Sequence, residues 1–141
     1  MVSVLLITYN HSQFIEECLD SILMQKTTFP FEILIGEDDS QDRTREICKK
    51  YAEKYPNKIQ LFLRSRSDVK LLFGKPTGMY NFQETLKAAK GKYIALCEGD
   101  DYWTDPLKLQ KQVDLLEANP QYAGCFTDAC IINHKGEVTV E

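Results

Sequence analysis

The chain has 141 residues, of which 43% are apolar and 27% are charged, and its formal net charge at pH 7 is −4. A chain of this length forms one domain that can bury a core without disulfide or metal crosslinks. The composition excludes a disordered or fibrous protein. The slight acidic excess argues against a general nucleic-acid binder, which would need clustered basic residues.

Short apolar runs alternate with helix-periodic segments over the first 118 residues. Runs that are apolar throughout, or at every second residue, predict buried strands at 2–7, 31–35, 58–64 and 93–97. Apolar residues at helical spacing predict helices over 12–23, 42–55, 82–89 and 105–116. We expect a long loop at 65–78 and two further strands at 122–132 and 137–140. The alternation predicts a three-layer α/β/α domain over residues 1–141, with a mostly parallel sheet.

Cysteine usage and the N-terminus indicate the compartment. The five cysteines include no C-x-x-C pair, which excludes an evident disulfide framework or zinc site. Most of them lie within apolar patterns, as is typical of a reducing compartment. The first residues lack the basic segment of a signal peptide, and no run approaches the ~20 apolar residues of a membrane span. We therefore expect a cytoplasmic protein without a transmembrane segment.

Two predicted strands run directly into acidic turns. Glu37-Asp38-Asp39 follows the second strand and Glu98-Gly99-Asp100-Asp101 follows the fourth, while the first strand ends in Thr8-Tyr9-Asn10. Ligands of open parallel sheets bind beyond the carboxyl ends of the strands. Two carboxylates ~4 Å apart repel by about 4 kcal/mol at an effective dielectric of ~20, so several together must bind protons or a cation, or turn to water. Oxygen ligands without Cys or His favour Mg²⁺ or Mn²⁺ over zinc.

Each acidic turn also has a structural interpretation. Helix capping accounts for residues 39–42, although it requires neither Glu37 nor Asp38. The turn at 98–101 can be a solvated turn. It is not needed as a helix cap, because Asp105 is available to cap the next helix. The basic residues from Arg64 to Lys75 are interpreted as the solvated face of a loop and not as a phosphate clamp.

Three segments, in order, resemble motifs of the family 2 inverting glycosyltransferases, which have the Rossmann-like GT-A fold. They are the opening strand at 2–10, the acidic segment at 35–44 and the segment at 89–103, which is similar to the strand leading into the family's D-x-D metal motif; the run at 107–113 also fits. Two positions depart from the family pattern. Glu98 stands where the family usually has Asp, and the 37–40 turn lacks the glycine of the commoner Asp-Asp-Gly-Ser.

The resemblance implies an enzyme that transfers a sugar from a nucleotide-diphosphate sugar, with a UDP-sugar the first expectation, to a saccharide or lipid-linked acceptor with inversion. A divalent cation, Mg²⁺ or Mn²⁺, would act as a Lewis acid on the diphosphate. The substrate-binding residues that it implies are Thr8, Tyr9, Asn10, Glu37, Asp38, Asp39, Asn81 and Asp100. The metal ligands that it implies are Glu98, Asp100 and Asp101.

Within this set, the resemblance assigns the base and ribose pocket to Thr8 and Tyr9, and a hydrogen bond from the base to Asp38. It also implies polysaccharide synthesis, with a peripheral association at the inner membrane face. In this family the acceptor site and general base lie in a later segment, so we expect them beyond Glu141. The 141 residues would then be the donor-binding part of a longer protein.

Two other functions stay open. Metal-dependent phosphohydrolase and phosphoacceptor domains also use acids at parallel strand ends, but they usually place an essential Asp after the first strand, where this chain has Thr8-Tyr9-Asn10. A non-catalytic nucleotide-binding module would use the same pocket without a general base. The transferase hypothesis requires the ends of the second and fourth strands, with Asp38 and Asp100, to meet at one side of the sheet.

Overall fold

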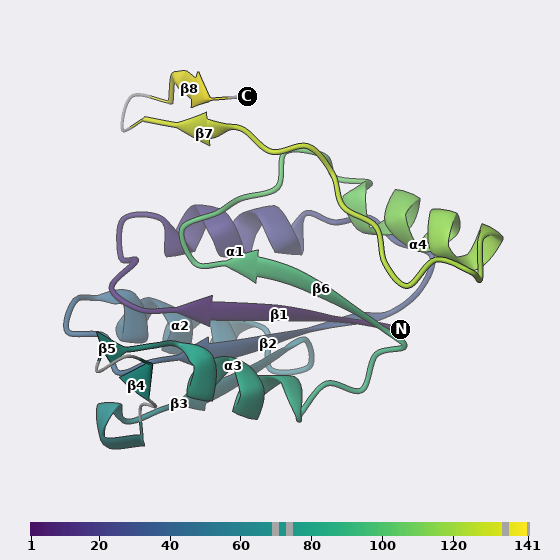
Figure 1. The fold of residues 1–141 in the computed structure, drawn as a ribbon. Coiled ribbons are helices and arrows are strands. Elements are labelled where there is room, and N and C mark those ends of the chain that lie inside the picture. Colours follow the sequence, from purple (N-terminus) through teal and green to yellow (C-terminus); the bar gives the residue numbers. More distant parts are fainter. Residues whose placement is uncertain (69–70, 73–74, 134–135, 141) are drawn as a thin grey trace.

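The structure is a computed structural model in which residues 1–68, 71–72, 75–133 and 136–140 are described. Its centre is a parallel sheet in the order β3-β2-β1-β6, formed by β1 (Val2–Thr8), β2 (Phe31–Glu37), β3 (Ile59–Leu63) and β6 (Tyr93–Glu98). The helices around it (Figure 1) are α1 (Ile15–Leu23), α2 (Thr44–Lys54), α3 (Met79–Leu86) and α4 (Lys108–Ala118). The shorter elements are the 3₁₀ turn η1 (Arg66–Asp68) and the antiparallel pairs β4 (Leu71–Leu72) with β5 (Lys75–Pro76) and β7 (Ile131–Ile132) with β8 (Val138–Val140).

The order of the strands determines which face each helix covers. The chain crosses the sheet in one direction from β1 to β3 and then returns past β1 to form β6. Right-handed crossovers in opposite directions place their helices on opposite faces. Accordingly, α1 and α2 lie on one face and α3 on the other (Figure 1). This confirms the predicted three-layer α/β/α class. The direction in which strands are added to the sheet reverses at β1, and ligands of such sheets bind at this point.

The face covered by α1, α2 and α4 holds the main hydrophobic core. Its buried residues include Val2, Val4, Leu6, Ile15, Cys18, Leu19, Ile22, Ile47, Cys48 and Leu109. The apolar stripe predicted for the first helix is thus the face that packs on the sheet. Each large apolar side chain that is fully buried contributes roughly 1.5–3 kcal/mol, so this layer fixes the strands whose ends form the candidate site.

The opposite face depends on one close approach between β2 and α3. Asn81 in α3 is 1% exposed, and its Nδ2 donates to the Gly36 carbonyl at 2.8 Å. A Cβ at position 36 would lie 2.3 Å from Asn81 Oδ1 and 2.5 Å from Thr85 Oγ1. Only glycine therefore lets α3 pack this closely on the sheet, just before the acidic turn that follows β2.

Two helices begin later than predicted, because polar residues at their predicted starts form other contacts. α1 begins at Ile15 without a side-chain cap, and the Ser12 amide instead donates to Asp42 Oδ2 at 3.0 Å. Asp105 Oδ1 does accept an amide hydrogen bond, from Leu107 at 2.8 Å, but α4 itself begins at Lys108. The polar residues near both helices stabilise turns that precede the helix.

Two segments outside the main sheet also differ from the prediction. The region expected as a loop at 65–78 contains η1 and the β4–β5 pair. In the tail, residues 122–130 form no strand, and only the short β7 and β8 pair there. The segment between these two predicted strands includes residues 134–135, which lie outside the described residues. Phe126 in this tail is 94% exposed, so its side chain does not pack on the domain.

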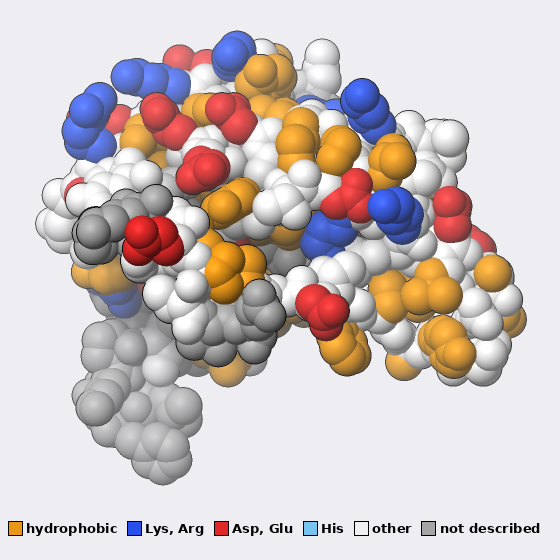
Figure 2. All heavy atoms as spheres, turned by 90° about the horizontal axis from the view of Figure 1, so that it is seen from above, with side chains coloured by type: hydrophobic (Ala, Val, Ile, Leu, Met, Phe, Trp, Pro, Cys, Tyr) orange, Lys and Arg blue, Asp and Glu red, His pale blue; other side chains and the backbone are white. Residues whose placement is uncertain are grey.

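The surface carries charges of both signs. Figure 2, which looks down on the molecule from above the view of Figure 1, shows acidic and basic side chains next to one another and interspersed with apolar ones. In the part of the chain that the structure describes, no helix has the length and apolar character needed to cross a bilayer.

Candidate functional site

The two acidic turns lie on either side of the end of β1. The Asp38 amide donates to the Thr8 carbonyl at 3.0 Å, and the Gly99 amide donates to the Ile7 carbonyl at 3.0 Å. Because β1 separates β2 from β6, the two turns begin roughly 10 Å apart, twice the ~4.8 Å spacing of neighbouring strands. The strand ends that carry the acidic turns therefore meet at one edge of the sheet.

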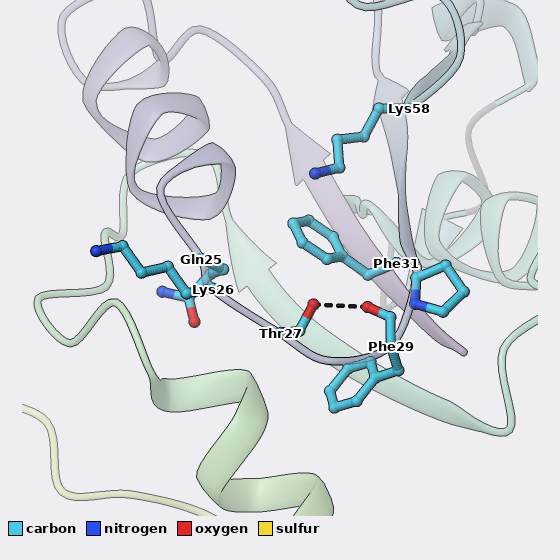
Figure 3. A pocket seen from close by; sticks show the side chains of 7 residues that line it. Gln25, Lys26, Thr27, Phe29, Phe31 and Lys58 are labelled. Atoms are coloured by element: carbon cyan, nitrogen blue, oxygen red, sulfur yellow. Dashed lines mark hydrogen bonds between the residues drawn. The ribbon is translucent and has the colours of Figure 1, made fainter.

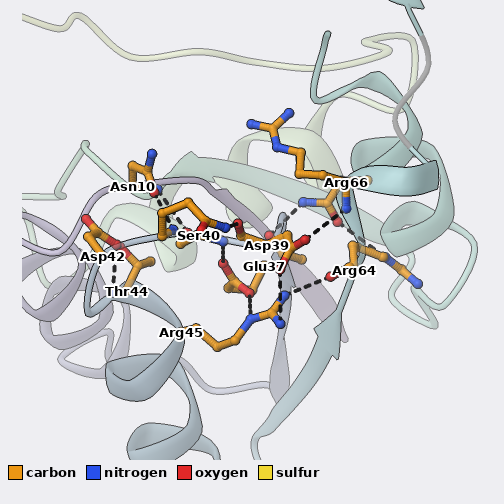
Figure 4. Close-up of polar contacts among 12 residues, drawn as sticks. Asn10, Glu37, Asp39, Ser40, Asp42, Thr44, Arg45, Arg64 and Arg66 are labelled. Carbon is orange, nitrogen blue, oxygen red and sulfur yellow. Dashed lines mark hydrogen bonds and ion pairs between the residues drawn. The ribbon is translucent and has the colours of Figure 1, made fainter.

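Glu37 is a buried counter-ion of Arg45. The Glu37 side chain is fully buried, its Oε1 accepts the Ser40 amide at 2.7 Å, and its Oε2 forms an ion pair with Arg45 Nε. Arg45 also contacts Asp39 Oδ1 at 3.3 Å and donates to the Arg64 carbonyl at 2.7 Å (Figure 4). Both carboxylate oxygens of Glu37 are thus used within the protein, where they hold the turn between β2 and α2.

Asp39 stands where the family pattern usually has glycine, and its backbone explains that preference. Its φ is 63°, in the left-handed region that favours glycine. Such a conformation costs a non-glycine residue roughly 1–2 kcal/mol. The Asp39 carboxylate offsets this by accepting the Arg66 amide at 3.1 Å and by pairing with Arg45. Asp39 therefore adopts a conformation that favours glycine, and its contacts with Arg45 and Arg66 hold it there.

Asn10 joins the turn after β1 to the turn after β2. Its φ is 55°, also left-handed. The Asn10 amide donates to Ser40 Oγ at 2.9 Å, and the Gln41 amide donates to Asn10 Oδ1 at 2.8 Å (Figure 4). Asn10 thereby fixes the position of Tyr9 relative to Asp38.

The contact between Ser12 and Asp42 leads to a prediction about acid stability. Partial desolvation raises the pKa of Asp42, but hydrogen bonds from Thr44 and Ser12 outweigh it and lower this pKa from 3.8 to about 2. The ionised carboxylate therefore stabilises the fold above pH 3.8, and this contribution is lost as the pH falls through about 2. With solvent screening allowed for, we expect Asp42→Asn to lower the free energy of unfolding by roughly 0.5–1 kcal/mol near neutrality.

The difference between Asp42→Asn and the unchanged protein should shrink as the pH falls below 3.8 and disappear below about 2. Urea unfolding at several pH values, followed by the fluorescence of Trp103, the single tryptophan, measures it. A difference that does not vary with pH would contradict this role of Asp42.

Asp38 faces Arg66 and Tyr9. Asp38 is 3% exposed, and its Oδ2 lies 3.3 Å from Arg66 Nη1. The guanidinium carbon of Arg66 lies 3.6 Å from the centroid of the Tyr9 ring. Burial raises the pKa of Asp38 above its ordinary value, and the positive charge of Arg66 opposes that change. Tyr9, Asp38 and Arg66 thus form one polar and aromatic cluster at the end of β2.

The interpretation of the basic residues after β3 as a solvated loop face is wrong for Arg64 and Arg66. Arg64 Nε lies 3.4 Å from Asn81 Oδ1, and Arg64 Nη2 lies 3.3 Å from Thr85 Oγ1. Arg66 pairs with Asp38. The excess of acidic residues at the end of β2 is the feature of the sequence that indicates this role, because buried carboxylates need basic side chains nearby. The side chains of Lys70 and Lys75 lie outside the described residues.

The second acidic turn packs against Thr8 and His11. His11 Nδ1 lies 3.2 Å from Thr8 Oγ1, and His11 Nε2 lies 3.8 Å from Asp100 Oδ2. A Cβ at Gly99 would lie 2.4 Å from Thr8 Oγ1 and 2.7 Å from His11 Nδ1, so glycine is required there. His11 was not among the predicted site residues; its position three residues after Thr8, at a strand end, is the signal that could have found it.

Asp100 and Asp101 are the carboxylates that fit a divalent cation. Burial and the neighbouring charge of Asp100 raise the pKa of Asp101. Within the described residues, no three His, Cys, Asp or Glu side chains are grouped to hold a metal. Mg²⁺ is typically held by one or two carboxylates, with water and substrate phosphates completing its shell. The donor set fits this open kind of site and does not fit a closed protein cage.

Asn81 and Glu98 lie differently from the other predicted ligands. Asn81 is buried between α3 and β2, where its amide is bonded to Gly36. The Cys97 side chain belongs to the core on the α1 face, so the side chain of Glu98 points to the opposite face of the sheet. The Glu98 carbonyl accepts the Asp101 amide at 3.0 Å and so shapes the turn.

Comparison with known proteins identifies the family. A family model described as "Glycosyl transferase family 2" matches residues 3–137. The chain belongs to glycosyltransferase family 2. Poly(ribitol-phosphate) beta-glucosyltransferase of Bacillus spizizenii is 34% identical to this family 2 domain over 104 residues, which are 72% of this chain and 15% of that protein.

Two further similarities concern the extent of the domain. The uncharacterized protein Rv1520 of Mycobacterium tuberculosis is 42% identical over 136 residues, which are 96% of this chain and 37% of that protein. The crystal structure of residues 1–349 of Staphylococcus aureus TarS in complex with UDP-GlcNAc matches with a TM-score of 0.62 and 29% identity, covering 84% of this chain and 32% of that one. The chain thus spans 37% or less of the length of each of these relatives.

A separate depression of about 410 Å³ lies at the other end of the sheet in this family 2 domain (Figure 3). It is lined by Gln25, Lys26, Thr27, Phe29, Pro30, Phe31 and Lys58. Lys58 Nζ lies 3.9 Å from the centroid of the Phe31 ring, and Thr27 Oγ1 donates to the Phe29 carbonyl at 2.6 Å. These residues precede or begin β2 and β3, so the depression is remote from the acidic turns at the carboxyl ends.

Proposed function

We propose that this domain binds the nucleotide diphosphate of a sugar donor across the carboxyl ends of β2, β1 and β6. The protein transfers the sugar, with inversion, to a saccharide or lipid-linked acceptor, and it works in the cytoplasm on a cell-surface polysaccharide. The observation that carries the proposal is the position of the two acidic turns on either side of the end of β1. The TarS complex with UDP-GlcNAc and the relative named as a glucosyltransferase support the substrate class.

The base binds at the β2 end of the site. Tyr9 is 36% exposed and offers an aromatic ring on which a planar base can stack. Asp38 accepts a hydrogen bond from an N–H on the edge of the base, and such bonds to a carboxylate are about twice as strong as neutral ones. Thr8, Asn10 and Asp39 act mainly by holding this pocket in shape.

The diphosphate lies at the β6 end, roughly 10 Å away. Asp100 and Asp101 would hold Mg²⁺ or Mn²⁺ there, whereas Glu98 shapes the turn through its carbonyl and its side chain points to the opposite face of the sheet. When bound, the cation neutralises the charge that develops on the leaving nucleoside diphosphate. His11 orients Asp100 from the Thr8 side. The general base and the acceptor site would lie in a later segment, as in other members of the family.

Calorimetric titration of the chain with UDP, with and without Mn²⁺, tests the proposal. We expect one saturable site and an affinity that rises at least about tenfold with Mn²⁺, because a cation held by Asp100 and Asp101 would offset their charge and that of the diphosphate. UMP, which lacks the second phosphate, should gain much less from Mn²⁺. GDP and ADP in the same series identify the preferred base.

The outcome separates the proposal from its alternatives. Failure of every nucleoside diphosphate to bind saturably would overturn the donor site. Binding without any sugar release by a longer protein that includes this domain, tested with several UDP-sugars and acceptors, would instead favour a non-catalytic nucleotide-binding module.

A further inference from the structure

We propose that Arg66 sets the affinity of the pocket for nucleotides by acting as an internal ligand that a base must displace. This inference rests on the proposed function. It concerns a side chain that belongs to neither acidic turn and to none of the motifs that define the family resemblance.

The contacts of Arg66 imitate those of a base. Its guanidinium lies on the Tyr9 ring, with 3.6 Å from the guanidinium carbon to the ring centroid, and its Nη1 lies 3.3 Å from Asp38 Oδ2. A guanidinium is planar, stacks on aromatic rings and donates N–H groups to carboxylates. A nucleotide base has the same three properties on its face and edge. The two groups therefore compete for one position.

The backbone of Arg66 allows this exchange without moving the loop. Its amide is anchored to Asp39 Oδ2 at 3.1 Å, so the start of η1 is fixed to the turn after β2. The side chain itself is 28% exposed and can swing toward solvent through its own torsions. Asp38 stays in place because its backbone is bonded to β1.

The exchange makes the pocket selective. Asp38 is almost completely buried, and a buried carboxylate that loses its partner is strongly unfavourable unless another donor replaces it. A base that presents a ring N–H to Asp38 replaces the guanidinium. A base with that nitrogen methylated leaves Asp38 unpaired. Because a base has to displace Arg66 before it binds, Arg66 lowers the affinity for every base. It lowers the affinity most for bases that lack a ring N–H to donate to Asp38.

Uridine is the first probe, because it carries the base and no phosphate charge. We expect Arg66→Gln to bind uridine about tenfold more tightly than the unchanged protein, since neither the cation–π contact nor the ion pair has to be broken. Arg43→Gln is the matched control: its side chain is 75% exposed and pairs only weakly with Glu46 at 3.9 Å. It should change uridine affinity by less than about twofold.

A second measurement does not depend on a substitution. In the unchanged protein, the ring current of Tyr9 shields the side-chain protons of Arg66. Nuclear magnetic resonance should show these resonances moving downfield as uridine saturates the site, while those of Arg43 stay in place. N3-methyluridine should bind more weakly than uridine and move them less.

Each outcome decides the inference. Tighter uridine binding by Arg66→Gln together with the downfield movement supports it. Unchanged or weaker uridine binding by a folded Arg66→Gln, or Arg66 resonances that do not move at saturation, overturns it and makes Arg66 a fixed wall of the pocket. If neither UDP nor uridine binds to the unchanged protein, the donor site itself is wrong and the inference falls with it.

Discussion

Replacing Arg45 by methionine is expected to lower the free energy of unfolding by about 3 kcal/mol. Glu37 is fully buried, and Arg45 is its charged partner. Removing one member of a buried ion pair typically costs ~3–5 kcal/mol because the other charge stays buried and unpaired. We expect the lower end of this range because the Arg45 side chain is 28% exposed and water can partly solvate the site. Urea unfolding followed by circular dichroism measures the change.

The double variant Glu37→Gln with Arg45→Met provides the control. It removes both charges together, while glutamine retains an oxygen that can accept the Ser40 amide. We expect it to recover most of the stability lost in Arg45→Met, because no buried charge is left without a partner. If the double variant is no more stable than Arg45→Met, the loss arises from the contacts of Arg45 with Asp39 and the Arg64 carbonyl and not from Glu37.

Replacing Asp100 by asparagine is expected to remove the metal dependence of nucleotide binding. In the presence of Mn²⁺ the affinity for UDP should fall by the whole gain that Mn²⁺ gives, at least about tenfold, which corresponds to about 1.4 kcal/mol or more. Without metal the affinity should stay the same or increase slightly, because a negative charge near the diphosphate is lost. Calorimetry with UDP and with UMP, each with and without Mn²⁺, separates the two effects.

Asp114→Asn is the matched control for this substitution. Asp114 lies on α4, where its carboxylate accepts a hydrogen bond from Gln110 at 2.8 Å. The Asp114→Asn substitution removes the same charge far from the acidic turns, and it should leave UDP affinity unchanged with or without Mn²⁺. An Asp100→Asn protein that still binds UDP more tightly with Mn²⁺ would move the cation to other ligands, and Asp101 and Glu98 would be tested next.

The strand ends of the candidate site could be found from the sequence because they follow buried strands directly. The apolar runs before Thr8, Glu37 and Glu98 fix where those residues sit, and parallel strands bring their carboxyl ends to one edge. The left-handed Asp39 was visible only indirectly, as a residue in the place of the family's usual glycine. Its contacts with Arg45 on α2 and with Arg66, which is 27 residues away in the sequence, depend on the fold.

The roles of individual polar residues within the site could not be predicted in this way. Glu37 and Asp38 are neighbours with similar side chains, yet the first binds Arg45 in the interior and the second meets Arg66 beside Tyr9. Alternation along a strand places their side chains on different sides of the sheet, and the packing of the fold decides which arginine lies on each side. The family resemblance likewise assigns Asn81 to substrate binding, but in the structure its side-chain amide joins α3 to β2.

By itself, the sequence determined the parallel α/β architecture, the apolar helix faces and the location of the acidic turns. Each of these follows from the pattern of apolar and polar residues along the chain, which local geometry converts directly into burial. Only the tertiary structure decided which carboxylate pairs with which arginine, that Arg66 covers Tyr9, and that His11 reaches Asp100. Those contacts depend on distances between segments that the fold brings together, and at short range such distances set the strength of each electrostatic interaction.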